Sequence, residues 1–396
     1  MKIVLGADQY PEYINGAATF TTRLARGLAA LGHTVDLLWP SATGAHDTHL
    51  ADGVRVHRLT SLSLPSRPRI QALHPSTGRR EVEQVLQITR PDVVHVQSHL
   101  GLGRTLLRAA RRSGVPVVAT NHFMPENLLH HVPVARSFPR TTSRLAWADL
   151  QRVYAGADLL SVPTQRAADL LATSTTLPVA EVISCGIDLD RFAAAPRTRT
   201  GSAPTVLFVG RLEREKNLDE LLRAFAGLPA RLGARLEVVG MGSRRRSLEA
   251  LADELGVGAT VRFLGAVDDD ELLAAYGRAD LFVMPGTAEL QSIATLEAMA
   301  SGLPVVAADA MALPHLVRPG SNGLLYAPGD TVALTDALLG LLADPVLRAA
   351  FGRASRSRAG QHALTRTVET FESRYAGLHE AQSRAAARRP ALAAAS

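Results

Sequence analysis

The segment that decides the fold runs from Met284 to Asp309 and reads MPGTAELQSIATLEAMASGLPVVAAD. It starts at the end of an apolar run, Leu281 to Met284, and passes through a loop with Pro and Gly into an Ala/Leu/Met-rich helical stretch. It ends in a second apolar run, Val305 to Ala307. A strand, a helix and a second strand in this order form a βαβ unit, which predicts neighbouring parallel strands in one sheet.

Two glutamates, Glu289 and Glu297, flank the start of this helical stretch. Because a helical path rises about 1.5 Å per residue, their spacing corresponds to about 12 Å, the distance from sugar to ribose in a sugar nucleotide. The unpaired amides of the helix start at Ser292 form a site for an anion such as a pyrophosphate. An amphipathic helix with two solvent-facing glutamates explains the same spacing, so the spacing alone leaves both interpretations open.

Short apolar runs alternate with helical patterns along nearly the whole chain, which is typical of βαβ units and predicts parallel sheets. At 396 residues the chain exceeds the size of a single core. We therefore expect an α/β protein with two doubly wound Rossmann-like domains that face a crevice. The expected strands are 2–7, 34–39, 54–59, 92–97, 116–121, 159–162 and 182–184 in the first half, and 205–209, 236–239, 261–264, 281–284 and 305–307 in the second.

Composition along the chain sets the expected domain boundaries. The N-terminal domain is predicted at 1–190, a linker at 191–204 because of its Ala, Pro, Thr and Gly content, and the second domain at 205–362. A C-terminal helix at 363–383 is expected to cross back to the N-terminal domain, and the Ala/Arg-rich tail at 384–396 to be disordered.

The overall composition limits the class of protein. Hydrophobic residues make up 46% and charged residues 20%, as in globular proteins. No stretch reaches the 18 or so apolar residues of a membrane span, and the apolar start is too short for a signal peptide, so we expect a cytoplasmic protein. The single cysteine, Cys185, excludes an internal disulfide. The net charge of +6 would suit nucleic acid, a membrane surface or an anionic substrate, but only 5% aromatic residues argue against nucleic acid.

Arg211 and Lys216, two cations five residues apart, follow the first strand of the second half in the segment from Gly210 to Asn217 (GRLEREKN). Arg211 can grip a diphosphate with its planar fork, and Lys216 can approach it as a point charge. Lysine occurs elsewhere only at Lys2, which suggests that a compact ammonium suits this position. A solvated basic loop is the alternative.

Candidates in the first half also follow strands. Gly16 opens a helical pattern whose small residues would let backbone approach a phosphate or sugar, although a simple helix start explains it too. His122 comes after an expected strand and could contact a sugar or take part in catalysis, and His130 and His131 follow soon after. No cluster of metal-ligand residues accompanies them, so no metal site is expected. Asp188 and the residues after it suit a turn or a helix cap better than a metal site.

Arginines at helical spacing form two basic stripes, Arg104, Arg108, Arg111 and Arg112 in the first and Arg136, Arg140 and Arg144 in the second. A solvated helix face is the default interpretation. Attraction to anionic lipid is the sharper one and would place the protein peripherally at the inner membrane face.

Together these motifs resemble the retaining, GT-B-fold glycosyltransferases of family 4. The segment VGRLEREKN is similar to the family's diphosphate-binding loop, and Glu289 with Glu297 fits its E-x7-E motif. Gly16 matches its first-domain glycine loop, and Cys185-Gly186-Ile187-Asp188 its Asn-Gly-Val-Asp segment, with cysteine in place of asparagine. Asn121-His122 matches its histidine position.

The resemblance implies a role for each matching residue. Gly210, Arg211 and Lys216 would hold the diphosphate of a UDP- or GDP-hexose donor, Glu289 would contact the transferred sugar, and Glu297 the ribose hydroxyls. His122, Arg211, Lys216 and Glu289 are the candidate catalytic residues. The base is expected near Arg262, Phe263 and Leu264, and the acceptor in the first domain.

One departure concerns Leu290-Gln291-Ser292, which stands where the family often has Gly-Phe-Gly. Backbone amides can still point at sugar and phosphate there, so these three residues are candidate donor contacts. Glutamine-bearing loops of this kind resemble those of glycolipid-forming members, which favours a lipid-linked acceptor. The resemblance implies hexosyl transfer without metal or other cofactor; a sugar-nucleotide epimerase of the same fold and a non-catalytic sugar-nucleotide-binding protein are the alternatives.

Overall fold

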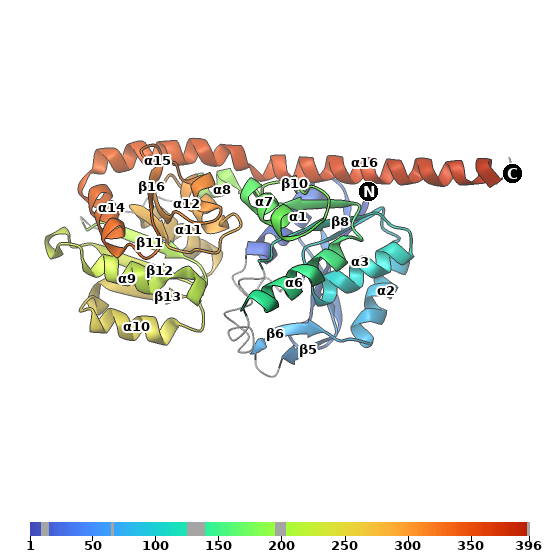
Figure 1. The fold of residues 1–396 in the computed structure, drawn as a ribbon, viewed down its shortest axis with the longest axis horizontal. Coiled ribbons are helices and arrows are strands. Elements are labelled where there is room, and N and C mark those ends of the chain that lie inside the picture. Colours follow the sequence, from blue (N-terminus) through green and yellow to red (C-terminus); the bar gives the residue numbers. More distant parts are fainter. Residues whose placement is uncertain (9–15, 65–66, 125–138, 195–202, 394–396) are drawn as a thin grey trace. The chain divides into compact units, whose positions relative to one another are not determined.

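The computed structural model describes residues 1–8, 16–64, 67–124, 139–194 and 203–393. The chain forms two compact units, one of Met1–Ser184 with Leu364–Ser396 and one of Cys185–Ala363 (Figure 1). The candidates His130, His131 and Arg136 lie outside the described residues.

The first unit is built on one eight-stranded sheet, with strand order β10-β9-β8-β7-β1-β2-β4-β3. All neighbouring strands are parallel except β3 and β4. Its strands are β1 (Lys2–Gly6), β2 (Thr34–Pro40), β3 (Asp47–Ala51), β4 (Val54–Leu59), β7 (Val93–Val96), β8 (Val117–Thr120), β9 (Leu159–Val162) and β10 (Glu181–Val182), and β5 (Ser61–Leu64) and β6 (Arg67–Leu73) form a separate antiparallel pair. The sequence did not indicate β3, β5 and β6, because edge strands such as DTHLA carry no buried apolar run.

Helices of the first unit connect these strands. They are α1 (Gly16–Ala30), α2 (Thr77–Thr89), α3 (Gly101–Arg112), α6 (Pro139–Tyr154), α7 (Gln165–Ser174) and α16 (Leu364–Ala393). The C-terminal helix α16 belongs to this unit and packs against α1 (Figure 1). It continues to Ala393, past the start of the predicted tail at 384, through residues whose Ala and Arg favour a helix.

The second unit contains a fully parallel six-stranded sheet with strand order β13-β12-β11-β14-β15-β16. The strands are β11 (Thr205–Val209), β12 (Arg235–Val239), β13 (Val261–Gly265), β14 (Leu281–Met284), β15 (Val305–Ala308) and β16 (Gly323–Tyr326). The helices are α8 (Leu189–Ala193), α9 (Leu218–Ala226), α10 (Arg245–Glu254), α11 (Asp269–Arg278), α12 (Ile293–Ala300), α13 (Leu313–Leu316), α14 (Thr331–Ala343) and α15 (Pro345–Ala359), with 3₁₀ turns at Arg214–Lys216, Ala230–Leu232, Gly258–Thr260 and Gly360–His362. Two α/β units, each with a sheet of mainly or fully parallel strands, confirm the predicted fold class.

The boundary between the units lies between Ser184 and Cys185, earlier than the predicted end of the first domain at 190. Phe192 is fully buried in the core of the second unit, so an apolar anchor lies where the linker was expected to begin. Asp188 accepts a hydrogen bond from the Arg191 amide at 3.0 Å and caps α8, which confirms its predicted capping role. Residues 195–202 of the expected linker lie outside the described residues.

Strand order also locates the loops that matter. In the second unit β11 has β12 on one side and β14 on the other, so the chain crosses over between β11 and β14. Such a switch point separates the loops at the carboxyl ends of two neighbouring strands and is where doubly wound sheets bind ligands. The loops after β11 and β14 are those that carry Arg211, Lys216 and Glu289.

Two glycines give a matched test of the packing between α1 and α16. A Cβ on Gly27 would lie 2.5 Å from Cγ2 of Val368, whereas a Cβ on Gly377 would meet nothing within 4 Å. Gly377→Ala should raise the free energy of unfolding of the first unit by up to about 1 kcal/mol through helix propensity. Gly27→Ala should lower it by about 1 kcal/mol, because overpacking against a stiff valine outweighs that gain. Urea unfolding measures both, and equal increases would contradict the packing of α16 on α1.

Candidate functional site

The loop after β11 is held by direct backbone packing against the loop after β12. A Cβ on Gly240, whose φ is +135°, would lie 1.9 Å from the Gly210 oxygen, and one on Gly242 would lie 2.3 Å from the Leu212 oxygen. The Leu212 amide donates to the Met241 oxygen at 2.9 Å. Only glycine allows this approach, so the segment that begins with Gly210 and Arg211 has a fixed path.

Asn217 ties the loop after β11 to the loop after β14. It has a left-handed backbone, with φ +49°, directly before α9. Its side-chain amide lies 3.2 Å from the Pro285 oxygen and 3.3 Å from Thr287 Oγ1, and the Thr287 amide donates to the Glu215 oxygen at 3.0 Å. These bonds bring Lys216 next to the segment that contains Glu289. Sequence reasoning did not single out Asn217, although asparagine before a helix is a known signal for a left-handed residue.

Lys216 and Glu289 form an ion pair between Nζ and Oε1, although 73 residues separate them in the sequence. Their side chains are only 13% and 10% exposed. Gly286 makes room for the pair, since a Cβ there would lie 3.1 Å from Glu289 Oε1 and 3.4 Å from Lys216 Cδ. The structure thus brings two of the predicted site residues into contact.

Arg211 lies in the same loop but has a different partner. Its Nη2 donates to Glu215 Oε1 at 2.8 Å, and the arginine side chain is 43% exposed. Glu215 itself is buried, and its Oε2 has no hydrogen-bond partner among the described residues. The guanidinium is therefore anchored at one end and still open to an anionic ligand.

The start of α12, four residues after Glu289 in the sequence, supplies backbone donors. Ser292 has φ +70° and does not cap the helix with its side chain; its Oγ instead lies 2.8 Å from Thr295 Oγ1. The amides of the first helical turn are consequently not taken by a side-chain cap, and together with the helix dipole they favour an anion.

Both glutamates of the spaced pair are buried, with Glu289 8% and Glu297 5% exposed. The interpretation as ordinary solvent-facing residues is therefore wrong. Glu297 Oε2 lies 3.0 Å from the hydroxyl of Tyr276 on α11, which also lies 3.2 Å from the Ala294 oxygen. Tyr276 was not a sequence candidate, because a tyrosine in an apolar helix gives no signal of such a contact.

The residues between the glutamates divide into different roles. The Cys185 amide donates to Gln291 Oε1 at 2.7 Å, and Gln291 is buried. The side-chain oxygen of Gln291 holds the turn that opens the second unit. Contact of the backbone amides of these residues with the donor stays a prediction. Leu290 is half-buried and carries no further sign of a ligand contact.

The expected base-binding segment lies within β13. Arg262 is 64% exposed with its guanidinium 3.6 Å from Glu237, while Phe263 and Leu264 are half-buried against the core. The Phe263 oxygen accepts from Arg245 Nη2 at 3.0 Å. A base contact by these residues stays a prediction.

The first-unit candidates lie at two different places. Gly16 is the first residue of α1 and is exposed. His122 follows β8; its Nε2 lies 2.9 Å from Gln97 Oε1, and its ring centroid lies 5.1 Å from that of Phe20. Burial lowers the pKa of His122 to about 4, so the imidazole is neutral at pH 7.

The first arginine stripe is largely ion-paired within the first unit. Arg104 binds Asp149 of α6, Arg111 binds Asp158 at 2.9 Å, and Arg112 binds Glu83 of α2 at 2.7 Å. These contacts tie α3 to its neighbours, which weakens the argument for lipid binding by this stripe. Within the described ranges, no helix is long and apolar enough to cross a membrane. The same ranges contain no group of three or more His, Cys, Asp or Glu placed to hold a metal ion.

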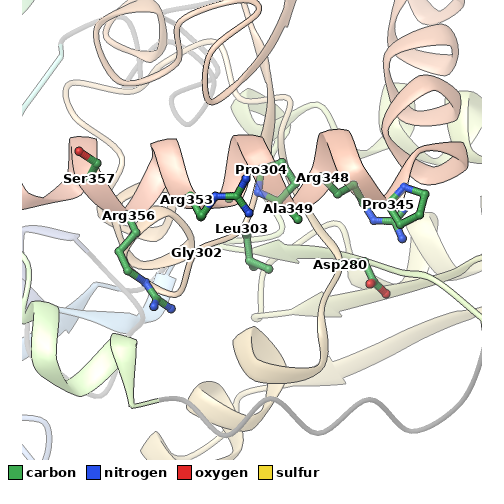
Figure 2. Close-up of a pocket in the computed structure, with 11 residues that line it drawn as sticks. Asp280, Gly302, Leu303, Pro304, Pro345, Arg348, Ala349, Arg353, Arg356 and Ser357 are labelled. Carbon is green, nitrogen blue, oxygen red and sulfur yellow. The ribbon is translucent and has the colours of Figure 1, made fainter.

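A pocket of about 680 Å³ lies near the amino-terminal ends of two strands of the second unit, where Asp280 precedes β14 and Gly302–Pro304 precede β15 (Figure 2). Arg348 donates to carbonyls at the end of α14, and Arg356 to carbonyls at the end of α12. These arginines complete helix ends, and the pocket contains none of the predicted site residues.

Two family models together match residues 14–358 of the chain. One described as Glycosyltransferase Family 4 matches residues 14–191, and one described as Glycosyl transferases group 1 matches residues 192–358. A GDP-mannose-dependent alpha-mannosyltransferase of Mycolicibacterium smegmatis is 33% identical over 366 residues, which are 90% of this chain and 92% of that protein. A D-inositol 3-phosphate glycosyltransferase 2 of Catenulispora acidiphila is 32% identical, over 89% of this chain and 88% of that protein.

Solved structures agree on the fold. Sucrose-phosphate synthase from Thermosynechococcus elongatus has a TM-score of 0.78 at 22% identity and covers 96% of this chain and 100% of that one. HepE of Anabaena in complex with UDP-glucose has a TM-score of 0.73 at 20% identity, over 95% and 99% of the two chains. The fold and the matches define a glycosyltransferase with two Rossmann-like halves. The chain belongs to glycosyltransferase family 4.

Hydrogen exchange tests the structural role of Gln291. Gln291→Leu should speed exchange of the Cys185 amide and lower the free energy of unfolding by about 1–3 kcal/mol, because a buried donor loses its acceptor. Cys185→Ala keeps the backbone amide and is the matched control, in which residue 185 should stay protected. Wild-type exchange at Cys185 in the leucine variant would contradict the bond.

Proposed function

We propose that the protein is a retaining hexosyltransferase that uses a nucleoside diphosphate sugar. The single observation that carries this proposal is the buried Lys216–Glu289 pair beside the uncapped start of α12. A cation, a carboxylate and free helix amides meet at the switch point of the second sheet. This combination suits a ligand with an anionic diphosphate and a hydroxyl-rich sugar.

Each residue then has a task in the reaction. Lys216, Arg211 and the first amides of α12 stabilise the negative charge that develops on the departing diphosphate, where fixed donors act most strongly. Glu289 accepts hydrogen bonds from the sugar, and Glu297 from the ribose. The acceptor hydroxyl attacks the anomeric carbon from the face that the diphosphate leaves, and a departing phosphate oxygen takes its proton. No separate base is required, and the α configuration is retained.

The ion pair also explains how the site exists before a donor binds. Lys216 is buried and would be costly to leave unpaired, so Glu289 balances its charge. An incoming diphosphate supplies a second anionic partner for Lys216, which frees oxygens of Glu289 for sugar hydroxyls. We assign Arg211 the outer phosphate, because its guanidinium is the more exposed of the two cations.

Relatives guide the choice of donor and acceptor to be tested. GDP-mannose comes first, since mannosyltransferases named for it in two mycobacterial species are 31% and 33% identical to this chain. UDP-glucose follows, because the HepE complex contains it. For the acceptor, a relative of Streptococcus pneumoniae at 27% identity is named alpha-monoglucosyldiacylglycerol synthase, whereas that of Catenulispora acidiphila is named for an inositol phosphate. A lipid-linked acceptor and peripheral membrane association stay predictions.

Product analysis tests the reaction itself. Purified protein is offered GDP-mannose, UDP-glucose or ADP-glucose with and without a diacylglycerol or an inositol phosphate. Nucleoside diphosphate released together with a new α-glycoside, seen by the anomeric proton signal, is expected for one pair. Epimerised donor without release would indicate an epimerase, and a β-linked product would contradict retention. Donor binding without any release would indicate a non-catalytic protein.

Two substitutions test the donor site. Lys216→Ala and Glu289→Gln should each lower kcat/KM for transfer by more than about tenfold, because each removes charge that acts on the transition state. Lys2→Ala, at the other lysine of the chain, is the matched control and should keep full activity. Circular dichroism checks the fold of each variant. Near-normal turnover of either site variant would reject the assignment.

A further inference from the structure

A chain of buried polar side chains leads from His122 to the C-terminal helix within the first unit. Gln97 Nε2 lies 3.1 Å from His95 Nε2, and His95 Nδ1 lies 2.6 Å from the hydroxyl of Tyr375 on α16. With the bond between His122 and Gln97, three side chains connect His122 to a helix far along the sequence. His95 and Tyr375 are 0% exposed and Gln97 is 2% exposed, so water does not compete for these bonds.

The orientation of the Gln97 amide, with its oxygen toward His122 and its nitrogen toward His95, sets where each proton lies. His122 Nε2 faces the amide oxygen of Gln97, which only accepts, so this nitrogen carries the proton. The Gln97 amide nitrogen only donates, so His95 Nε2 is the bare nitrogen and His95 Nδ1 carries the proton. Thr120 Oγ1 lies 2.6 Å from the same nitrogen, and in this tautomer the Tyr375 oxygen, 2.6 Å from Nδ1, accepts from it.

Neither histidine carries a charge in this arrangement. Burial lowers the pKa of His95 well below its ordinary value, and that of His122 to about 4. Each ring therefore has one donor and one acceptor nitrogen at pH 7, and the amide of Gln97 couples the two rings. If the Gln97 amide turned over, both tautomers would have to reverse together.

The remaining nitrogen of His122, Nδ1, lies at the end of this series of side chains. Among the residues that the structure describes, none bonds to Nδ1 of His122. Phe20 packs on the ring at 5.1 Å between centroids, and Phe20 in turn packs on Phe371 of α16 at 6.0 Å. The ring is thus oriented by packing while its proton is placed by hydrogen bonds.

We propose that His95, Gln97 and Tyr375 are positioning residues that hold His122 in its Nε2-protonated form, so that Nδ1 accepts a hydrogen bond from a substrate hydroxyl. The substrate part of this inference rests on the proposed glycosyl transfer, whereas the placement of the proton does not. The C-terminal helix then has a role beyond stability, because the Tyr375 oxygen accepts the hydrogen bond at the far end of this series of side chains.

Nitrogen-15 NMR of histidine-labelled protein without substrate tests the placement. A protonated and a bare ring nitrogen differ in shift, and the signals of His122 are identified by their loss in His122→Asn. Wild type should show a proton on Nε2 of His122. Tyr375→Phe should convert His122 partly or fully to the Nδ1-protonated form, since His95 Nδ1 loses its acceptor. Tyr326→Phe is the matched control and should change nothing, because the buried Tyr326 hydroxyl has no partner among the described residues.

A second variant keeps the test decisive if Tyr375→Phe does not fold. Gln97→Leu separates the two rings, so it should also release the tautomer of His122. A His122 that stays Nε2-protonated in whichever of these variants folds, or that carries its proton on Nδ1 in wild type, would overturn the proposal.

Kinetics then test the contribution to the reaction, once transfer by the wild type is established. Gln97→Leu and Tyr375→Phe should each lower kcat/KM by about fivefold to tenfold, the size of one hydrogen bond. The double variant should lose no more of its kcat/KM than Gln97→Leu alone, since both substitutions act through the same series of hydrogen bonds. Additive losses, or full activity with a changed tautomer, would overturn the role in the reaction. Absence of transfer in the wild type would count against the proposed function and leave the NMR result standing.

Discussion

The ion pair between Lys216 and Glu289 is the constraint on which the second unit's site depends. A buried charge is tolerated only with a partner, so each of these side chains requires the other. The requirement joins two loops that are 73 residues apart, and Asn217 and Gly286 allow the close approach. Because the loops follow neighbouring strands, the pair lies at the switch point of the sheet.

The first unit contains a buried polar network of uncharged side chains. The buried His95 is neutral because burial disfavours the cation, and it bonds to hydroxyl and amide groups that need no counter-ion. This network spans β7, β8 and the C-terminal helix α16. The return of α16 to the first unit therefore brings a polar contact, that of Tyr375, as well as the apolar surface of Phe371.

Several arginines of the described residues have a structural part. Arg104, Arg111 and Arg112 join α3 to acidic residues nearby, and Arg348 and Arg356 complete the ends of α14 and α12. A sequence with a net charge of +6 suggests an anionic partner, but many of these charges already have partners within their own unit. The cations that take part in the proposed chemistry are Arg211 and Lys216 in the loop after β11.

The sequence by itself determined the features that depend on neighbouring residues. Apolar runs predicted most parallel strands, and their order placed Arg211, Lys216 and Glu289 in loops at strand ends. Asp188 was predictable as a cap because its acceptor role needs only the next turn. The strands β3, β5 and β6 were missed, since pairing with a neighbour, and not an apolar run, defines them. The short apolar strand β16 was also not among the expected strands.

Only the tertiary structure decided which distant groups meet. Gln291 bonds to an amide 106 residues away, and His95 to a tyrosine 280 residues away. No local sequence pattern predicts such contacts, because they join elements that are far apart in the sequence. Burial decided the rest: it showed that Glu297 faces Tyr276 and not water, and it made His122 a neutral ring.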